Sequence, residues 1–105
     1  MSTYIDEIEY TNVWFYTEAG NTEEFKIERT KDLVKYKDNV LLTEREYTAT
    51  ANSIGYVEFQ LPDTVNMELD KDGNEQTYNI RYQDSMEFFN VPNQDNANLN
   101  NLIGE

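Results

Sequence analysis

The chain has 105 residues, the size of one domain with a single modest core. Only 38% of its residues are hydrophobic, so the core must rest largely on the eight Tyr, five Phe and one Trp. The absence of Cys excludes disulfides and thiolate metal sites. No apolar run approaches the length of a membrane span, and no basic segment precedes an apolar one near the start, so we expect neither a membrane span nor a secretory signal.

The net charge of −13 is unevenly distributed. Residues 26–45 contain six basic and four acidic residues, a net charge of +2, so the rest of the chain carries −15. A surface of this kind repels nucleic acids and anionic lipids, and we expect neither a nucleic acid nor a membrane as partner. The charge indicates either a solubilising surface or a protein partner with a basic surface.

The first part of the chain predicts a loose arm and two strands. Residues 1–9 are polar and acidic and form the arm. Residues 10–16 alternate with apolar side chains on both faces, as expected for a strand that is covered on both sides. Residues 24–29 alternate again, and the Gly-Asn signal in residues 18–21 predicts a turn. We expect the two strands to form a hairpin.

The middle of the chain predicts four more strands, of which the last is the most regular. Short strand candidates lie at residues 33–36, 40–42 and 44–50, and one helical turn over residues 30–37 is the alternative to the first of them. Residues 56–62 alternate strictly, with Val57, Phe59 and Leu61 on one face, and end at a proline that cannot donate to a ladder. Gly55 in the preceding turn suits a positive φ.

Residues 64–82 predict a hairpin of their own. Two alternating runs flank Asp72-Gly73, the residue pair that most often forms a tight hairpin turn. Residues 85–91 continue in an extended conformation up to a proline.

The end of the chain predicts one helical turn in an otherwise irregular arm. Residues 90–101 contain six Asn, a composition that avoids regular structure, and Asp95 and Asn96 are candidate caps for the turn. Leu99, Leu102 and Ile103 recur at helical spacing. A turn this short is not stable alone, so these side chains pack either on the domain itself or on a neighbouring subunit. We favour the neighbour, because terminal arms often become ordered on contact.

Short alternating runs with little helical periodicity predict an all-β fold. We expect a single small β-sandwich of about seven strands, with its core in residues 8–92 and a C-terminal arm in residues 93–105. The inward face of residues 57–61, Ile80 and at least one of Val13 and Phe15 should be buried.

The sequence contains no constellation of catalytic or metal-binding residues. Without His and Cys, the usual general base, the thiol nucleophile and most zinc ligand sets are missing. The acidic residues after Asp70 resemble a calcium loop only superficially. Counted from Asp70, Gly73 is fourth and Arg81 is twelfth, whereas an EF-hand has Gly at the sixth place and Glu at the twelfth. We expect a protein that is not an enzyme and that holds no cofactor or metal.

Two groups of residues are candidates for partner binding. The first is Trp14 with Tyr16, which lie on the second face of their strand. Such aromatic residues either anchor a partner or, more commonly, are covered by the domain's other sheet. The second group is the helical triplet Leu99, Leu102 and Ile103.

Two segments resemble a known family. Residues 51–62, Ala-Asn-Ser-Ile-Gly-Tyr-Val-Glu-Phe-Gln-Leu-Pro, are similar to the T-x-x-x-G-y-x-x-f-x-L-P segment of carboxypeptidase-regulatory-like (transthyretin/Ig-like) β-sandwiches in tailed-bacteriophage structural proteins. Residues 89–102 contain Phe-Asn-Val-Pro-Asn and Ala-Asn-Leu-Asn-Asn-Leu, which are similar to the family's f-x-V-P-[DN] … a-n-L-x-x-L ending. The family's Gly-rich first hairpin has no counterpart here.

The resemblance implies a virion component, assembled in the host cytoplasm, that docks on other virion structural proteins or on further copies of itself. It fits capsid decoration, a neck or collar position, or fibre attachment. Two alternatives stay open. One is a small acidic inhibitor or DNA mimic, of the anti-restriction or anti-CRISPR type, that binds a basic host enzyme. The other is a carbohydrate-binding module that uses Trp14 and the tyrosines.

Overall fold

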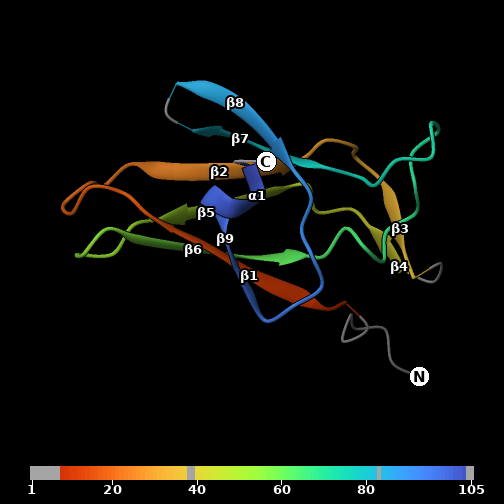
Figure 1. Cartoon of the computed structure of the whole chain (residues 1–105), viewed down its shortest axis with the longest axis horizontal. Coiled ribbons are helices and arrows are strands. Elements are labelled where there is room, and N and C mark those ends of the chain that lie inside the picture. The colour runs from red at the N-terminus through yellow and green to blue at the C-terminus, as the bar shows by residue number, and fades with distance from the viewer. Residues whose placement is uncertain (1–7, 38–39, 83, 104–105) are drawn as a thin grey trace.

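The computed structural model describes residues 8–37, 40–82 and 84–103. In these residues the chain forms nine strands and one short helix (Figure 1). The strands are β1 (Tyr10–Tyr16), β2 (Glu24–Arg29), β3 (Val34–Tyr36), β4 (Val40–Leu42), β5 (Glu46–Thr50), β6 (Tyr56–Pro62), β7 (Tyr78–Tyr82), β8 (Ser85–Phe89) and β9 (Asn96–Asn98), and the helix is α1 (Leu99–Ile103). Most of the expected N-terminal arm, residues 38–39, residue 83 and the last two residues lie outside the described residues.

Seven of these strands form two sheets that face each other across one core. Sheet A has the order β6-β1-β9, and sheet B has the order β5-β2-β7-β8. The remaining two strands, β3 and β4, pair with each other at one end of the molecule (Figure 1). The prediction of a small all-β sandwich is confirmed. None of the described residues belongs to a helix long and apolar enough to cross a membrane.

The core is built from the inward faces that the alternation predicts. Val57, Phe59 and Leu61 of β6 are buried, and Val13 and Phe15 of β1 are fully buried beside them. Sheet B contributes further buried side chains to the same cluster, namely Ile27, Tyr78, Ile80 and Phe89. A residue points to the opposite side of a strand from its neighbours, so one apolar face on each strand is sufficient to fill the space between the sheets.

The predicted hairpin of residues 10–29 is wrong, although both strands have the predicted bounds. β1 pairs antiparallel with β6 and parallel with β9, whereas β2 pairs antiparallel with β5 and β7. The turn itself is present, with the Asn21 amide donating to the carbonyl of Glu18 at 3.1 Å. Residues 17–23 therefore carry the chain from one sheet to the other. Alternation defines the buried face of a strand but does not define its neighbour.

The predicted hairpin of residues 64–82 is also wrong, although its turn is correct. Gly73 has a φ of +83°, and the Asp70 amide donates to the carbonyl of Asn74 at 2.9 Å. The first run of the predicted hairpin is not a strand: it contains only an isolated β-bridge between Met67 and Tyr36 of β3. Since β2 and β8 occupy both sides of β7, the segment before the turn has no place beside it.

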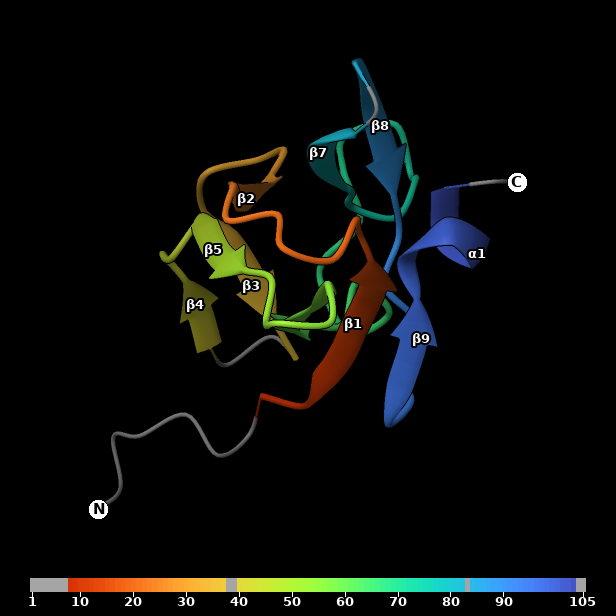
Figure 2. The same cartoon turned by 90° about the vertical axis from the view of Figure 1, so that its left-hand side faces the viewer.

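The C-terminal segment closes one open side of the sandwich. β9 lies parallel to β1 at the edge of sheet A, and the Asn12 amide donates to the carbonyl of Asp95 at 3.0 Å. α1 follows directly and contacts β1, β8 and β9 (Figure 2). The helix thus covers the gap between the edge strands of the two sheets.

Candidate protein-interaction surfaces

Three aromatic side chains form a cluster on the outer face of sheet A. We call Trp14, Tyr16 and Tyr56 the aromatic surface. β1 and β6 bury their odd-numbered residues, so these even-numbered side chains project from the sheet on the other side. The Trp14 ring centroid lies 6.0 Å from that of Tyr16 and 6.3 Å from that of Tyr56. The two tyrosine centroids are 5.3 Å apart.

The aromatic surface is open to solvent and is not covered by sheet B. Tyr16 is 55% exposed. Trp14 and Tyr56 are half-buried, and they contact Tyr16 and each other within sheet A. The expectation that the domain's other sheet covers Trp14 and Tyr16 is therefore wrong, because their face points away from the core. Tyr56 was not among the candidates: its place beside Tyr16 depends on the pairing of β1 with β6.

Polar side chains on the same face fix the orientation of Tyr56. The Tyr56 hydroxyl donates to Oε1 of Glu58 at 3.0 Å and accepts from Nδ2 of Asn12 at 3.4 Å. Nε2 of Gln60 donates to Oδ1 of Asn12 at 2.7 Å. The Tyr56 ring is thus oriented before any partner binds, which reduces the entropy cost of binding.

The C-terminal triplet belongs to the domain's own core, so the expected docking arm needs correction. Leu99 has no exposed surface, and Leu102 and Ile103 pack partly buried against the same cluster. Asn98, rather than Asp95 or Asn96, caps the helix, since its Oδ1 accepts from the Asn100 amide at 2.9 Å. The pairing of β9 with β1 holds the segment in place, which leaves Leu99 unavailable as an anchor for a neighbour.

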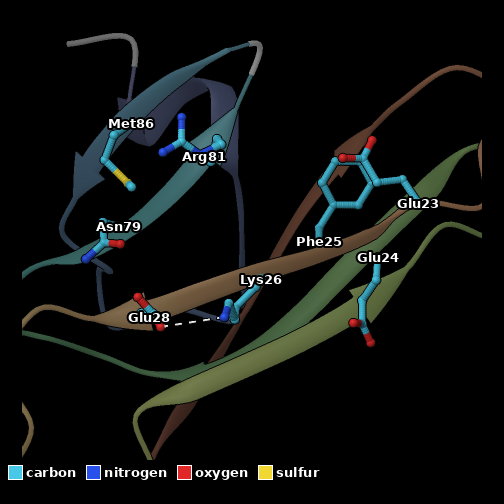
Figure 3. Close-up of a pocket in the computed structure, with 8 residues that line it drawn as sticks. All are labelled: Glu23, Glu24, Phe25, Lys26, Glu28, Asn79, Arg81 and Met86. Atoms are coloured by element: carbon cyan, nitrogen blue, oxygen red, sulfur yellow. Dashed lines mark ion pairs between the residues drawn. The ribbon is translucent and has the colours of Figure 1, made fainter.

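A cleft of about 290 Å³ lies on sheet B where β2 and β7 separate (Figure 3). These two strands pair only between residues 27–29 and 78–80. Phe25 of β2 is half-buried in the cleft, and its ring meets that of Phe15 edge-on at 5.2 Å. The other lining residues are Glu23, Glu24, Lys26, Glu28, Asn79, Arg81 and Met86.

Charges of both signs line this cleft. Nζ of Lys26 lies 3.8 Å from Glu28 and 4.0 Å from Glu46, so its charge is compensated within sheet B. Arg81 has no ion-pair partner in residues 8–37, 40–82 and 84–103. Two large apolar side chains of β8 are exposed nearby: Met86 by 45% and Phe88 by 57%. The sequence analysis did not single out these residues, because the alternation of β8 does not say which face is buried.

Acidic side chains of residues 70–75 accept hydrogen bonds from neighbouring groups of the domain. Oδ1 of Asp70 accepts hydrogen bonds from the amides of Asp72 and Asn74, both at 2.9 Å. Oε1 of Glu75 accepts from the Thr64 hydroxyl at 2.8 Å. In the part of the chain that the structure describes, no group of three or more acidic side chains is placed to hold a metal ion.

Comparisons with known proteins identified no relative of the chain. No family model, no curated protein and no solved structure matches it. Its function therefore has to be argued from the surfaces described above.

Proposed function

We propose that this chain is a non-enzymatic structural or adaptor protein of a tailed-phage virion, and that it docks on other virion proteins through the aromatic surface. The observation that carries docking is the position of Trp14, Tyr16 and Tyr56 on the outer face of a sheet whose inner face already fills the core. Trp and Tyr are the residues most enriched among the anchors of protein interfaces. Ring area left in solvent contributes nothing to the core but is available to a partner.

The ring geometry favours a protein partner over a carbohydrate. A flat sugar ring stacks on an aromatic face that is open to solvent, and an extended glycan needs several such faces in one plane. Here the planes of Trp14 and Tyr56 lie within 29° of each other, but the exposed Tyr16 ring is tilted by 79° against Trp14 and by 59° against Tyr56, so the three rings do not share one plane. The tilted rings form an uneven apolar surface, which suits the side chains of another protein.

The virion setting rests on the resemblance of residues 51–62 and 89–102 to phage β-sandwiches. In the fold, the first segment forms the Gly55 turn and β6, and the second runs from the end of β8 into α1. Both segments contain buried core residues, Val57 and Leu99 among them. The resemblance therefore rests mainly on residues that build the fold. The aromatic surface adds the means by which such a module attaches.

The test is incorporation into purified virions. The tagged chain should co-purify with particles at a fixed ratio, and Tyr16→Ser combined with Trp14→Ser should reduce incorporation at least about tenfold, as expected for the loss of interface anchors. Val65→Ser, which alters another exposed apolar side chain, is the matched control. Absence of the chain from particles would contradict the virion setting. Normal incorporation of a folded double variant would contradict docking through the aromatic surface.

A further inference from the structure

The outer face of sheet B carries a second surface, which we call the β8 patch: Arg81, Met86 and Phe88. We propose that the β8 patch and the adjoining cleft bind a second copy of this chain in a twofold-symmetric dimer. The inference concerns a different face from the aromatic surface and does not depend on the virion setting.

The β8 patch is contiguous because of strand register. In the antiparallel pair of β7 and β8, Met86 lies opposite Arg81 and Phe88 lies opposite Asn79. Residues directly opposite each other point to the same side of a sheet. The intervening Ile80 is buried, so this row of side chains faces outward. Two large apolar side chains and a guanidinium therefore lie next to one another on the surface.

The composition of the patch is that of an interface core. Met, Phe and Arg are enriched at the centres of protein interfaces, whereas Glu and Lys are depleted there. The ion pairs of Lys26 with Glu28 and Glu46 lie farther along the same sheet and would form a polar rim. An exposed Phe beside an exposed Met on an otherwise charged face has the character of a binding surface.

The charges of the cleft identify the second copy as the occupant. Figure 3 shows Arg81 on one side of the cleft and Glu23, next to Phe25, on the other, and no ion pair joins Arg81 to Glu23. In a twofold interface both copies present the same surface, so a contact between two different residues of the two copies occurs twice. Arg81 of each copy can therefore pair with Glu23 of the other.

Other partners fit these charges less well. A partner that is basic throughout would leave Arg81 opposed by like charge, and one that is acidic throughout would leave Glu23 opposed by like charge. A second copy supplies both signs at the required places. Each copy has a net charge of −13, but the repulsion between two copies is screened beyond about 8 Å at physiological salt, so the close contacts decide whether the dimer forms.

The experiment is sedimentation velocity on the purified chain in 150 mM salt, over a wide range of protein concentration. We expect a reversible equilibrium between monomer and dimer. Phe88→Ser should weaken dimerisation by at least about tenfold, as expected for the loss of a central anchor. Leu41→Ser, which changes the exposed residue of β4, is the matched control and should leave the dissociation constant unchanged. Because these side chains are exposed, unchanged thermal melting will show that each variant is folded.

A charge exchange tests the pairing itself. Arg81→Glu and Glu23→Arg should each weaken the dimer by about tenfold, whereas the two substitutions together should restore it, because the ion pair is re-formed with its signs reversed. A chain that stays monomeric at every concentration would overturn the inference. A dimer that tolerates Phe88→Ser would place the interface elsewhere, and a double variant as weak as the single ones would refute the pairing of Arg81 with Glu23.

Discussion

Replacing Arg29 by Met tests whether one buried cation holds the middle of the chain together. Arg29 is the last residue of β2 and has no exposed surface. Its guanidinium donates to four backbone carbonyls at 2.6–3.0 Å, those of Lys31, Asp32, Leu42 and Glu44. Lys31 and Asp32 lie in the loop before β3, Leu42 is the last residue of β4, and Glu44 lies in the link between β4 and β5. The side chain thus joins two irregular segments to sheet B.

The expected loss follows from those four bonds. Met fills much of the same volume but donates no hydrogen bond, so four carbonyls lose a charged donor. Each such bond contributes about 1.5–3 kcal/mol, but relaxation and entering water recover part of the sum. A buried carbonyl that is left without a donor costs about 1–3 kcal/mol, so after this recovery we expect Arg29→Met to lower the free energy of unfolding by about 3–5 kcal/mol. This is a large share of the roughly 5–15 kcal/mol available to a domain.

Urea denaturation followed by circular dichroism measures the effect. Lys35→Met, which removes an exposed cation, is the matched control and should change stability by less than about 0.5 kcal/mol. Arg29→Lys should fall between the two, because a single ammonium cannot reach all four carbonyls. A loss of less than about 1 kcal/mol for Arg29→Met would refute the reasoning, since water would then replace the guanidinium without penalty.

Gly55→Ala should lower the free energy of unfolding by at least about 3 kcal/mol, because φ is +88° and the new Cβ would lie 2.2 Å from the Thr17 carbonyl oxygen. Gly73→Ala is the control: its φ is +83° but its Cβ would meet open space, so we expect a loss of only about 1–2 kcal/mol. Equal losses for the two variants in urea denaturation would contradict this reasoning. Leu99→Ala should cost about 2–5 kcal/mol by the same measurement, and a smaller loss would restore the docking-arm hypothesis. Burial and the hydrogen bond to the Asp63 carboxylate raise the pKa of Tyr36 to about 12, so the folded state favours the neutral phenol. The contribution of Tyr36 to stability should be intact below about pH 10 and should fall as the pH rises towards 12. Tyr36→Phe should therefore flatten the decline of the melting temperature over this pH range.

Local patterning predicted the strands of this fold better than their partners. β1, β2 and β6 have the bounds that alternation indicates, because a strand that buries one face must alternate. Pairing depends on contacts between residues far apart in sequence, which a local pattern does not contain. The first incorrect hairpin joined two consecutive strands that pair with other neighbours. The second placed a strand at residues 65–69, where the chain forms only an isolated bridge from Met67 to Tyr36.

Buried polar residues and the interaction surfaces were only partly predictable. The sequence analysis counted Arg29 among the basic residues of the chain, although it shares the inward face of Ile27 two positions earlier, and that parity could have indicated its burial. Trp14 and Tyr16 were found by alternation, whereas Tyr56 joins them only through the register of β1 with β6. The assignment of Leu99 to a neighbour failed because β9 has only three residues, too few to predict from its pattern.

The two surfaces together predict a bivalent assembly. The sheets face each other through their inner sides, so the aromatic surface and the β8 patch point away from each other. A dimer formed through sheet B would therefore leave one aromatic surface free on each copy. On a particle that repeats the partner, two linked sites increase avidity by about 10²–10⁴ if the spacing permits both to bind. Phe88→Ser should then weaken binding to the array while leaving binding to one isolated partner unchanged, as measured by surface plasmon resonance at high and low partner density. Equal weakening at both densities would show that the β8 patch contacts the partner directly.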